Sequence, residues 1–412
     1  MRSTQLTIGP GFPCLSGLGF ALGLAMTSTA CGASAASGVV SPAEPEDIAS
    51  LSSRARAALE GGDLEAAWRA SSRALDLSAD DASAQDVAAR VALARGDDEG
   101  AVRVLRRATA PVLVRLRARA RFRRGELAAA AEDLASVEDR DPVDGWAVAV
   151  LPIARAGSGM ELYRLEGAGE TVLPFVPDVP VPVVAIVIDG RTVNALVATS
   201  ADLTILDDGV RESSGIADRL ELGGVSVQRV PVLVRDLDEV SSQVGVPLGA
   251  VLGIDLLLRL GATLDGRERR LVLRRERDDG PMAGAAIPFV TLGGTFLAVR
   301  AEVDGRTSGW LTVDSAGLFP VAVSDVTTAH LRWTADDVTT VPGAPSGRVM
   351  LGRIRSLRMA EVELADLPAL TGLVPAELPD LAGVPVAGML GSALWMQLRI
   401  TLDPRDRSIH VE

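Results

Sequence analysis

The stretch Trp310-Leu-Thr-Val-Asp-Ser-Ala-Gly317 decides the fold of the second half of this chain. An alternating apolar run ends abruptly in a carboxylate and is followed by small residues. This pattern is typical of a strand that delivers an acid into a tight turn. We therefore expect Asp314 to be presented at a site directly after a strand.

The same frame occurs earlier in the chain, which indicates an internal duplication. Val187-Ile-Asp-Gly-Arg-Thr192 leads into Ala195-Leu-Val-Ala-Thr-Ser-Ala201, as Val303-Asp-Gly-Arg-Thr307 leads into the stretch that contains Asp314. The residue at the carboxylate position of the first copy is Ala198. A second pair of matching segments follows, since residues 252–267 parallel residues 390–405.

These residues resemble the retropepsin-like aspartic peptidases of the pepsin and retropepsin superfamily. The lobes of that family carry a hydrophobic-Asp-Thr/Ser-Gly turn and a later Leu-Gly-x-Asp-Phe-Leu type segment. The resemblance covers roughly the last 230 residues and implies a two-lobed all-β domain. Lobe 1 is expected at 181–276 and lobe 2 at 287–412, with a polar, small-residue connector at 277–286 between them.

The resemblance assigns roles to residues of both turns. Asp314 takes the place of the catalytic-type aspartate, and Ser315 takes the place of the residue whose hydroxyl supports the turn. In lobe 1 Thr199 fits the motif, but Ala198 stands where the family has its other aspartate. Such peptidases need two close carboxylates that share one proton and activate a water. The resemblance therefore implies an incomplete catalytic pair.

The turns depart from the family pattern in two further ways. Ala316 occupies the usual Gly place and Gly317 the usual Ala place, while Ser200 replaces the Gly of the first turn. The swap puts the backbone geometry of the second turn in question.

Other acids are poor replacements for the missing aspartate. Asp202, Asp207 and Asp208 follow the first turn but do not occupy its carboxylate position, and a strand-turn geometry aims them elsewhere. Asp255 matches the aspartate of the family's later segment, which is structural in type. A homodimer that pairs two copies of Asp314 is an alternative, although the covalently attached lobe 1 should occupy the same interface.

Residues 47–157 predict an all-helical region, because Ala, Leu, Arg, Glu and Asp recur there with helical spacing. Gly62-Asp63 recurs as Gly96-Asp97, and a shorter echo begins at Gly125. The spacing of about 34 residues is that of tetratricopeptide repeats, which this region resembles. Gly permits a tight turn, and the small Ala that follows it lets paired helices approach closely. The resemblance implies a surface for a protein partner; an Ala-rich helical spacer is the alternative.

Residues 1–35 have the features of an export signal: an early Arg, a short apolar core and a small-residue exit. Cys31 resembles the lipidated cysteine of bacterial lipoproteins, although Ser28 stands where that motif normally has Leu. The alternative is cleavage after Ala35, which would discard Cys31. We expect a periplasmic, outer-membrane or cell-surface lipoprotein, or else a secreted protein, with membrane contact only through the lipid.

Two linkers are expected around the helical region. Residues 36–46 are small, polar and Pro-containing, which suits a tether. Residues 158–180 contain scattered Gly and Pro, which mark a linker or the first strand of the β domain. The fold class is therefore α plus all-β, with helical hairpins followed by a two-lobed β domain.

Composition excludes several functions. The formal charge of −13 opposes nucleic-acid binding, and the run 115–124, rich in Arg, is interpreted as a solvated helix face. The two cysteines lie in the leader, so the mature chain is expected to form no disulfide. His330 and His410 lack the spacing of a metal site, and no nucleotide-binding loop or serine-hydrolase motif occurs. We expect no metal and no cofactor, and we interpret Trp310 and Trp395 as core.

The sequence leads to a functional hypothesis and two alternatives. The hypothesis is an exported, degenerate aspartic-peptidase-like protein that binds a peptide or protein between its lobes. The first alternative is an active endopeptidase that uses Asp314 as a homodimer or with an unconventional second acid. The second alternative is a non-catalytic scaffold of the cell envelope that interacts through its helical repeats.

Overall fold

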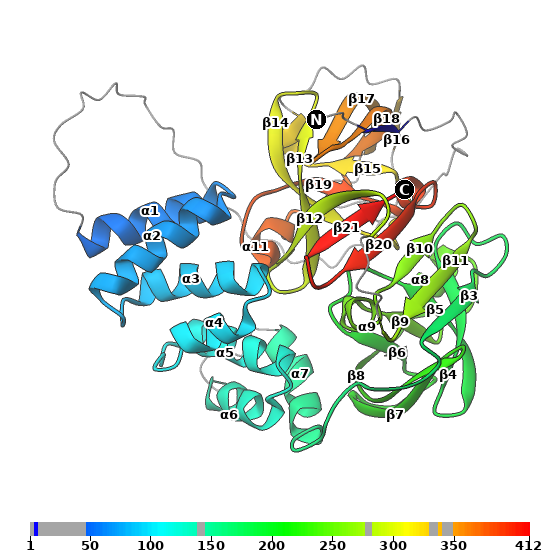
Figure 1. Cartoon of the computed structure of the whole chain (residues 1–412), viewed down its shortest axis with the longest axis horizontal. Coiled ribbons are helices and arrows are strands. Elements are labelled where there is room, and N and C mark those ends of the chain that lie inside the picture. The colour runs from blue at the N-terminus through cyan, green and yellow to red at the C-terminus, as the bar shows by residue number, and fades with distance from the viewer. Residues whose placement is uncertain (1–3, 7–46, 138–144, 277–281, 329–336, 340–348) are drawn as a thin grey trace.

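A computed structural model of the chain describes residues 4–6, 47–137, 145–276, 282–328, 337–339 and 349–412. An arc of helices lies along one side of a β domain that has two lobes (Figure 1). The predicted helical region followed by a two-lobed β domain is confirmed in this coarse form.

The helical region consists of helices that pair across tight turns. Its helices are α1 (Ile48–Glu60), α2 (Leu64–Leu77), α3 (Ala82–Ala94), α4 (Asp98–Val104), α5 (Pro111–Arg123), α6 (Leu127–Val137) and α7 (Gly145–Ala156). Gly62, Gly96 and Gly125 lie in the turns of the α1–α2, α3–α4 and α5–α6 hairpins, with φ of 73°, 72° and 78°. This left-handed conformation favours Gly because it has no Cβ.

The residues after each turn explain how the hairpins close. The Asp63 carboxylate caps α2 by accepting from the backbone N–H of Ala66 at 2.9 Å, and Asp97 caps α4 in the same way from Gly100 at 2.8 Å. The alanines Ala67, Ala101 and Ala130 are fully buried, as close helix approach requires. The glycines therefore lie in the turns, and the alanines that follow them are buried.

Lobe 1 consists mainly of antiparallel strand pairs and contains two parallel pairs in its interior. Its elements are β2 (Arg164–Gly167), β3 (Glu170–Pro174), β4 (Val183–Ile188), β5 (Arg191–Val197), β6 (Thr204–Asp207), β7 (Gly215–Leu222), β8 (Val225–Arg235), α8 (Asp238–Val244), β9 (Ala250–Leu252), α9 (Ile254–Arg259), β10 (Thr263–Asp265) and β11 (Arg270–Arg274). The strand order is β2-β8-β6-β9-β5-β4-β7. Within it β5 runs parallel to β9, and β6 runs parallel to β8.

Lobe 2 repeats this arrangement. Its elements are β12 (Ala285–Leu292), β13 (Phe296–Val303), β14 (Thr307–Val313), β15 (Val321–Val323), α10 (Asp325–Thr328), β16 (Asp337–Thr339), β17 (Val349–Met359), β18 (Val362–Thr371), α11 (Leu378–Ala382), β19 (Val386–Leu390), α12 (Ser392–Trp395), β20 (Arg399–Asp403) and β21 (Ser408–Val411). Here β14 runs parallel to β19 and β15 runs parallel to β18. The pairs correspond to β5–β9 and β6–β8, so β14 of lobe 2 is the counterpart of β5 of lobe 1.

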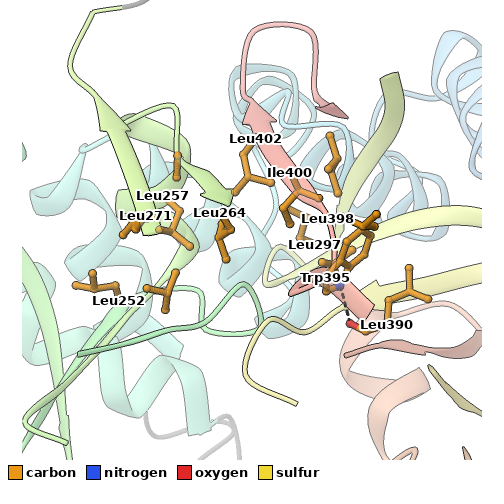
Figure 2. Close-up of a cluster of buried hydrophobic side chains, with 14 of the residues drawn as sticks. Leu252, Leu257, Leu264, Leu271, Leu297, Leu390, Trp395, Leu398, Ile400 and Leu402 are labelled. Carbon is orange, nitrogen blue, oxygen red and sulfur yellow. Dashed lines mark hydrogen bonds between the residues drawn. The ribbon is translucent and has the colours of Figure 1, made fainter. Parts of the chain in front are cut away.

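A sheet shared by both lobes joins them, in the order β3-β11-β10-β20-β21-β12. At its centre β10 pairs antiparallel with β20, and the buried hydroxyls of Thr263 and Thr401 lie 2.8 Å apart. Leu257 and Leu264 of lobe 1 belong to the same core cluster as Ile400 and Leu402 of lobe 2 (Figure 2). Trp395 is 2 % exposed and donates its indole N–H to the Leu390 carbonyl at 3.0 Å, as expected for a core residue.

Two segments outside the predicted lobes contain strands. Residues 158–180, expected as a linker or the first strand of the β domain, contain β2 and β3, and β3 belongs to the shared sheet. In the predicted leader, β1 (Thr4–Leu6) pairs in parallel with β18, while residues 7–46, Cys31 included, lie outside the described residues. Among the helices that the structure describes, none has the length and apolar character needed to span a membrane.

The Arg-rich run on α5 is not a solvated face. The Arg117 side chain is 12 % exposed and pairs with the Asp133 carboxylate of α6 at 2.7 Å. Arg121 reaches the other oxygen of Asp133, also at 2.7 Å. The interpretation from spacing was wrong because a buried acid on the neighbouring helix makes an inward-facing arginine favourable.

Candidate functional site

Two equivalent turns meet where the lobes face each other. The backbone N–H of Ala198, directly after β5, donates to the Leu252 carbonyl at 3.0 Å. In lobe 2 the N–H of Asp314, directly after β14, donates to the Leu390 carbonyl at 2.8 Å. The pseudo-symmetric bonds place Ala198 and Asp314 at matching positions, as the sequence duplication predicts.

Reciprocal hydrogen bonds lock the two turns together. The Thr199 hydroxyl donates to the Val313 carbonyl at 2.7 Å and accepts from the Ser315 N–H at 3.0 Å. The Ser315 hydroxyl donates to the Val197 carbonyl at 2.7 Å and accepts from the Thr199 N–H at 3.0 Å. Both side chains are buried, so these bonds are shielded from water and fix the spacing of the turns.

The Asp314 carboxylate has a partner in each lobe. One oxygen, Oδ1, accepts from the Ser200 hydroxyl of lobe 1 at 2.9 Å and from the Ala316 N–H of its own turn at 3.1 Å. Burial raises the pKa of Asp314 above its usual value, and the bonds from Ser200 and the turn amides partly oppose this rise. The residue as a whole is partly exposed, whereas its carboxylate is surrounded by protein atoms.

The reversed order of Ala316 and Gly317 fits the turn. A Cβ at position 317 would lie 2.8 Å from Asp314 Oδ2 and 2.6 Å from the Phe319 ring, closer than real Cβ atoms approach. Ala316 needs no such space and supplies an N–H to the carboxylate. The swap therefore preserves the turn, and Gly is required at the second of the two positions.

Ala198 lies in an apolar environment. It is 3 % exposed and belongs to a cluster with Leu196, Leu248 and other apolar residues of lobe 1. Ala316 and Leu318 of lobe 2 pack against the same cluster. A methyl group suits this position, whereas a carboxylate there would lose its hydration.

The acids considered as replacements make contacts of their own. Asp202 accepts from the Trp146 indole N–H of α7 at 3.1 Å. Asp207 accepts from the backbone N–H groups of Gly209 and Leu237. Asp208 is exposed. The structure therefore places Asp314 beside Ser200, and the contacts of these acids lie within lobe 1 or with the helices.

Asp255 lies at the start of α9, and its carboxylate is held by hydroxyl groups from two other segments. It accepts from the Tyr163 hydroxyl at 3.0 Å and from the Thr204 hydroxyl at 3.2 Å. Burial raises the pKa of Asp255 to about 6, against the lowering effects of the Tyr163 hydrogen bond and of Arg259. The Arg259 guanidinium also lies 4.0 Å from the Tyr163 ring centroid.

A crevice of about 200 Å³ adjoins this cluster where α5 and α7 meet both lobes. Its charged lining is paired internally, since Arg123 lies 3.2 Å from Asp98 and Arg119 stacks 4.4 Å from the Trp146 ring centroid. Sequence reasoning missed this cluster, because its members come from distant segments and share no local motif.

The sequence predicts no metal site, and three acids lie close together among the described residues. Oxygens of Asp207, Asp236 and Asp238 lie within 4.8 Å of one another. Asp207 caps the backbone N–H groups described above, and Asp236 accepts from the Asp238 N–H at 2.8 Å. His410 bonds to Ser408 within β21 at 3.0 Å, while His330 lies outside the described residues.

Comparison with known proteins gives weak likenesses. No protein-family model matches the chain, and no curated protein matches it. A retropepsin-like aspartic protease from Rickettsia conorii is 13% identical over 33% of this chain and 96% of its own, with a TM-score of 0.23. An O-GlcNAc transferase mutant from Thermobaculum terrenum is 24% identical over 28% of this chain, with a TM-score of 0.25. This chain spans 23% of that transferase.

Proposed function

We propose that the junction of the two lobes binds an extended peptide or protein segment without hydrolysing it. The carrying observation is that Asp314 meets the Ser200 hydroxyl at 2.9 Å, while the matching turn of lobe 1 presents the methyl group of Ala198. The fold, the duplicated turns and the reciprocal bonds of Thr199 and Ser315 fit a degenerate aspartic-peptidase-like protein.

The chemistry of hydrolysis argues against activity. Peptide cleavage by paired acids needs one carboxylate to take a proton from water while the other donates a proton to the substrate carbonyl. Ser200 provides a hydroxyl, which has neither the acidity nor the basicity for that exchange. The Asp314 carboxylate and the Ser200 hydroxyl carry the polar groups that could bond the backbone of a bound segment, and neither residue as a whole is fully buried.

The homodimer alternative is disfavoured by the contacts that lobe 1 already makes. A second copy of Asp314 would have to approach through the surface where Thr199 and Ser315 are bonded. Those bonds form within one chain, at a high effective concentration. An intermolecular dyad would have to displace them.

The remaining parts of the proposal concern location and the helical region. The leader favours an exported protein, with Cys31 as a candidate lipid attachment site. The Gly turns and buried alanines of the helical hairpins fit tetratricopeptide-like repeats. The alternative of a pure scaffold predicts partners that bind the helices and ignore Asp314.

The test is to mix the purified chain from residue 36 onward with a diverse peptide pool from acid to neutral pH. Bound peptides and cleavage products are both measured by mass spectrometry. We expect peptides to be retained intact, and retention to fall about tenfold in Asp314→Asn, the effect of one hydrogen bond to a charged group. The matched control is Asp218→Asn, which changes an exposed aspartate of β7.

Two outcomes would overturn the proposal. Cleavage by the wild-type chain that disappears in Asp314→Asn would mean that Asp314 has found a second acid, and the active endopeptidase would be correct. Equal retention by the wild type and Asp314→Asn would mean that peptides do not bind at the junction of the lobes. That result would favour the alternative of a non-catalytic scaffold.

A further inference from the structure

The face of the helical region that is turned toward the β domain is already occupied. We call this the inner face; it comprises the contacts of α1–α3 with lobe 2 and of α5–α7 with lobe 1 (Figure 1). Leu59, Ala67 and Val91 pack in one apolar cluster with Trp310 and Val386 of lobe 2. An apolar contact of this kind favours a fixed arrangement of the two parts of the chain.

Polar groups of lobe 2 bond to the carbonyls at two helix ends. The Trp310 indole and the Arg300 guanidinium donate to the Gly62 carbonyl after α1, at 2.9 and 3.1 Å. The Arg407 guanidinium donates to the Ala94 carbonyl at the end of α3, at 3.0 Å. Carbonyls at helix C-termini have no partner within the helix, so these donors satisfy groups that would otherwise need water.

The second half of the helical region holds lobe 1. Phe122, Leu127 and Ile153 pack with Leu203 and Leu233 of lobe 1 in a separate cluster. The Trp146–Asp202 hydrogen bond described above joins the same surfaces. The helical region therefore contacts both lobes and bridges them.

These contacts lie next to both turns of the candidate site. Trp310 lies on β14, the strand that ends at Asp314. Asp202 and Leu203 follow directly after the turn that contains Ala198. A shift of the helices relative to either lobe would therefore be transmitted to the spacing of the two turns.

We propose that the helical region stays bound to the β domain of its own chain. In this position it fixes lobe 1 relative to lobe 2. The inner face is then unavailable to other proteins. The inference does not depend on peptide binding, because it concerns the association of two parts of the chain.

The test uses the full chain with a protease recognition sequence inserted after Gly159. Ser158, Gly159 and Met160 are exposed, and a Cβ added at Gly159 would meet no atom within 4 Å, so the insertion should be tolerated. After cleavage we expect the helical and β fragments to co-elute at micromolar concentration. Separation of the two fragments would overturn the proposal.

A pair of variants identifies the contact responsible. Trp310→Phe removes the indole donor to Gly62 across the interface, whereas Trp395→Phe removes an indole donor to Leu390 within lobe 2. We expect Trp310→Phe to weaken fragment association about tenfold, as for one buried hydrogen bond, and Trp395→Phe to leave it unchanged. Equal effects of the two variants would contradict an interface role for Trp310. Peptide retention can fail while the fragments co-elute, so this result is separable from the proposed function.

Discussion

Ser200 of lobe 1 donates its hydroxyl to the Asp314 carboxylate of lobe 2 at 2.9 Å. The bond crosses the lobe junction and joins the turn after β5 to the turn after β14. It stabilises the charged form of Asp314, which burial disfavours. Ser200 therefore partly opposes the rise in the pKa of Asp314 that burial causes.

Removal of this hydroxyl should raise the pKa of Asp314 further. In Ser200→Ala the carboxylate loses one donor while its burial is unchanged. The titration of Asp314, followed by NMR of carboxyl-labelled aspartate, should move to higher pH than in the wild type. Ser213→Ala, at an exposed position, should leave it in place. A shift to lower pH would mean that the hydroxyl does not donate to the carboxylate.

The Thr199–Ser315 bonds should stabilise the junction of the lobes. Thr199→Val keeps the shape but leaves the Val313 carbonyl and the Ser315 N–H without their partner. We expect the free energy of unfolding in urea to fall by about 2 kcal/mol, the cost of unsatisfied buried groups.

A control and a double mutant make this test specific. Thr192→Val changes an exposed threonine on β5 and should alter the free energy of unfolding by less than about 0.5 kcal/mol. Because Thr199 and Ser315 share their bonds, Thr199→Val and Ser315→Ala should be non-additive in the double mutant. Strict additivity would argue that the two turns do not act together.

An acid introduced in the first turn tests whether the junction can hold a second carboxylate. Ala198→Asp places a second carboxylate opposite Asp314, so one of the pair should titrate well above the usual range of Asp. The variant should be less stable than the wild type at neutral pH and should recover as the pH falls, because protonation relieves the repulsion. Thermal unfolding across pH measures this. Ala198→Asn has a similar volume without the charge, and its destabilisation should not depend on pH.

Much of the site could be predicted from the sequence because it depends on short local patterns. The strand that ends at Asp314, the matching place of Ala198 and the Gly turns of the helical hairpins each follow from residues close together in the chain. The roles of Ser200 and Trp310 could not be predicted. The sequence showed Ser200 only as a residue that differs from the family motif. Its hydrogen bond to Asp314 joins different lobes, which a local pattern does not reveal.

Long-range contacts also explain what the sequence patterns could not predict. Trp310 is buried, as expected for a core residue, but its indole bonds to Gly62 of the helical region. The arginines of α5 were expected in solvent, but the Asp133 carboxylate of α6 forms ion pairs with two of them. In each case the partner lies on another element, and periodicity within one element carries no information about it.

The buried Asp255 should make stability depend on pH. Its pKa rises from 3.8 to about 6 on folding, so the folded state binds more protons than the unfolded state between these values. The free energy of unfolding should therefore fall as the pH rises from about 4 to about 6, by roughly 3 kcal/mol from this residue. Asp255→Asn should remove that part of the pH dependence, whereas Asp218→Asn should keep it. An unchanged pH profile in Asp255→Asn would mean that the Asp255 pKa is not raised.

Substitution of two glycines in the helical turns distinguishes the cost of backbone strain from the cost of a lost interface contact. Gly96 and Gly125 have similar φ, 72° and 78°, so an Ala at either position should cost about 1 kcal/mol for the left-handed conformation. A Cβ at Gly125 would meet no atom within 4 Å, but a Cβ at Gly96 would lie 2.2 Å from the Arg407 guanidinium. Gly96→Ala must therefore also displace Arg407 from the Ala94 carbonyl. Urea unfolding should show a larger loss of stability for Gly96→Ala than for Gly125→Ala, and equal losses would mean that Arg407 contributes nothing to helix docking.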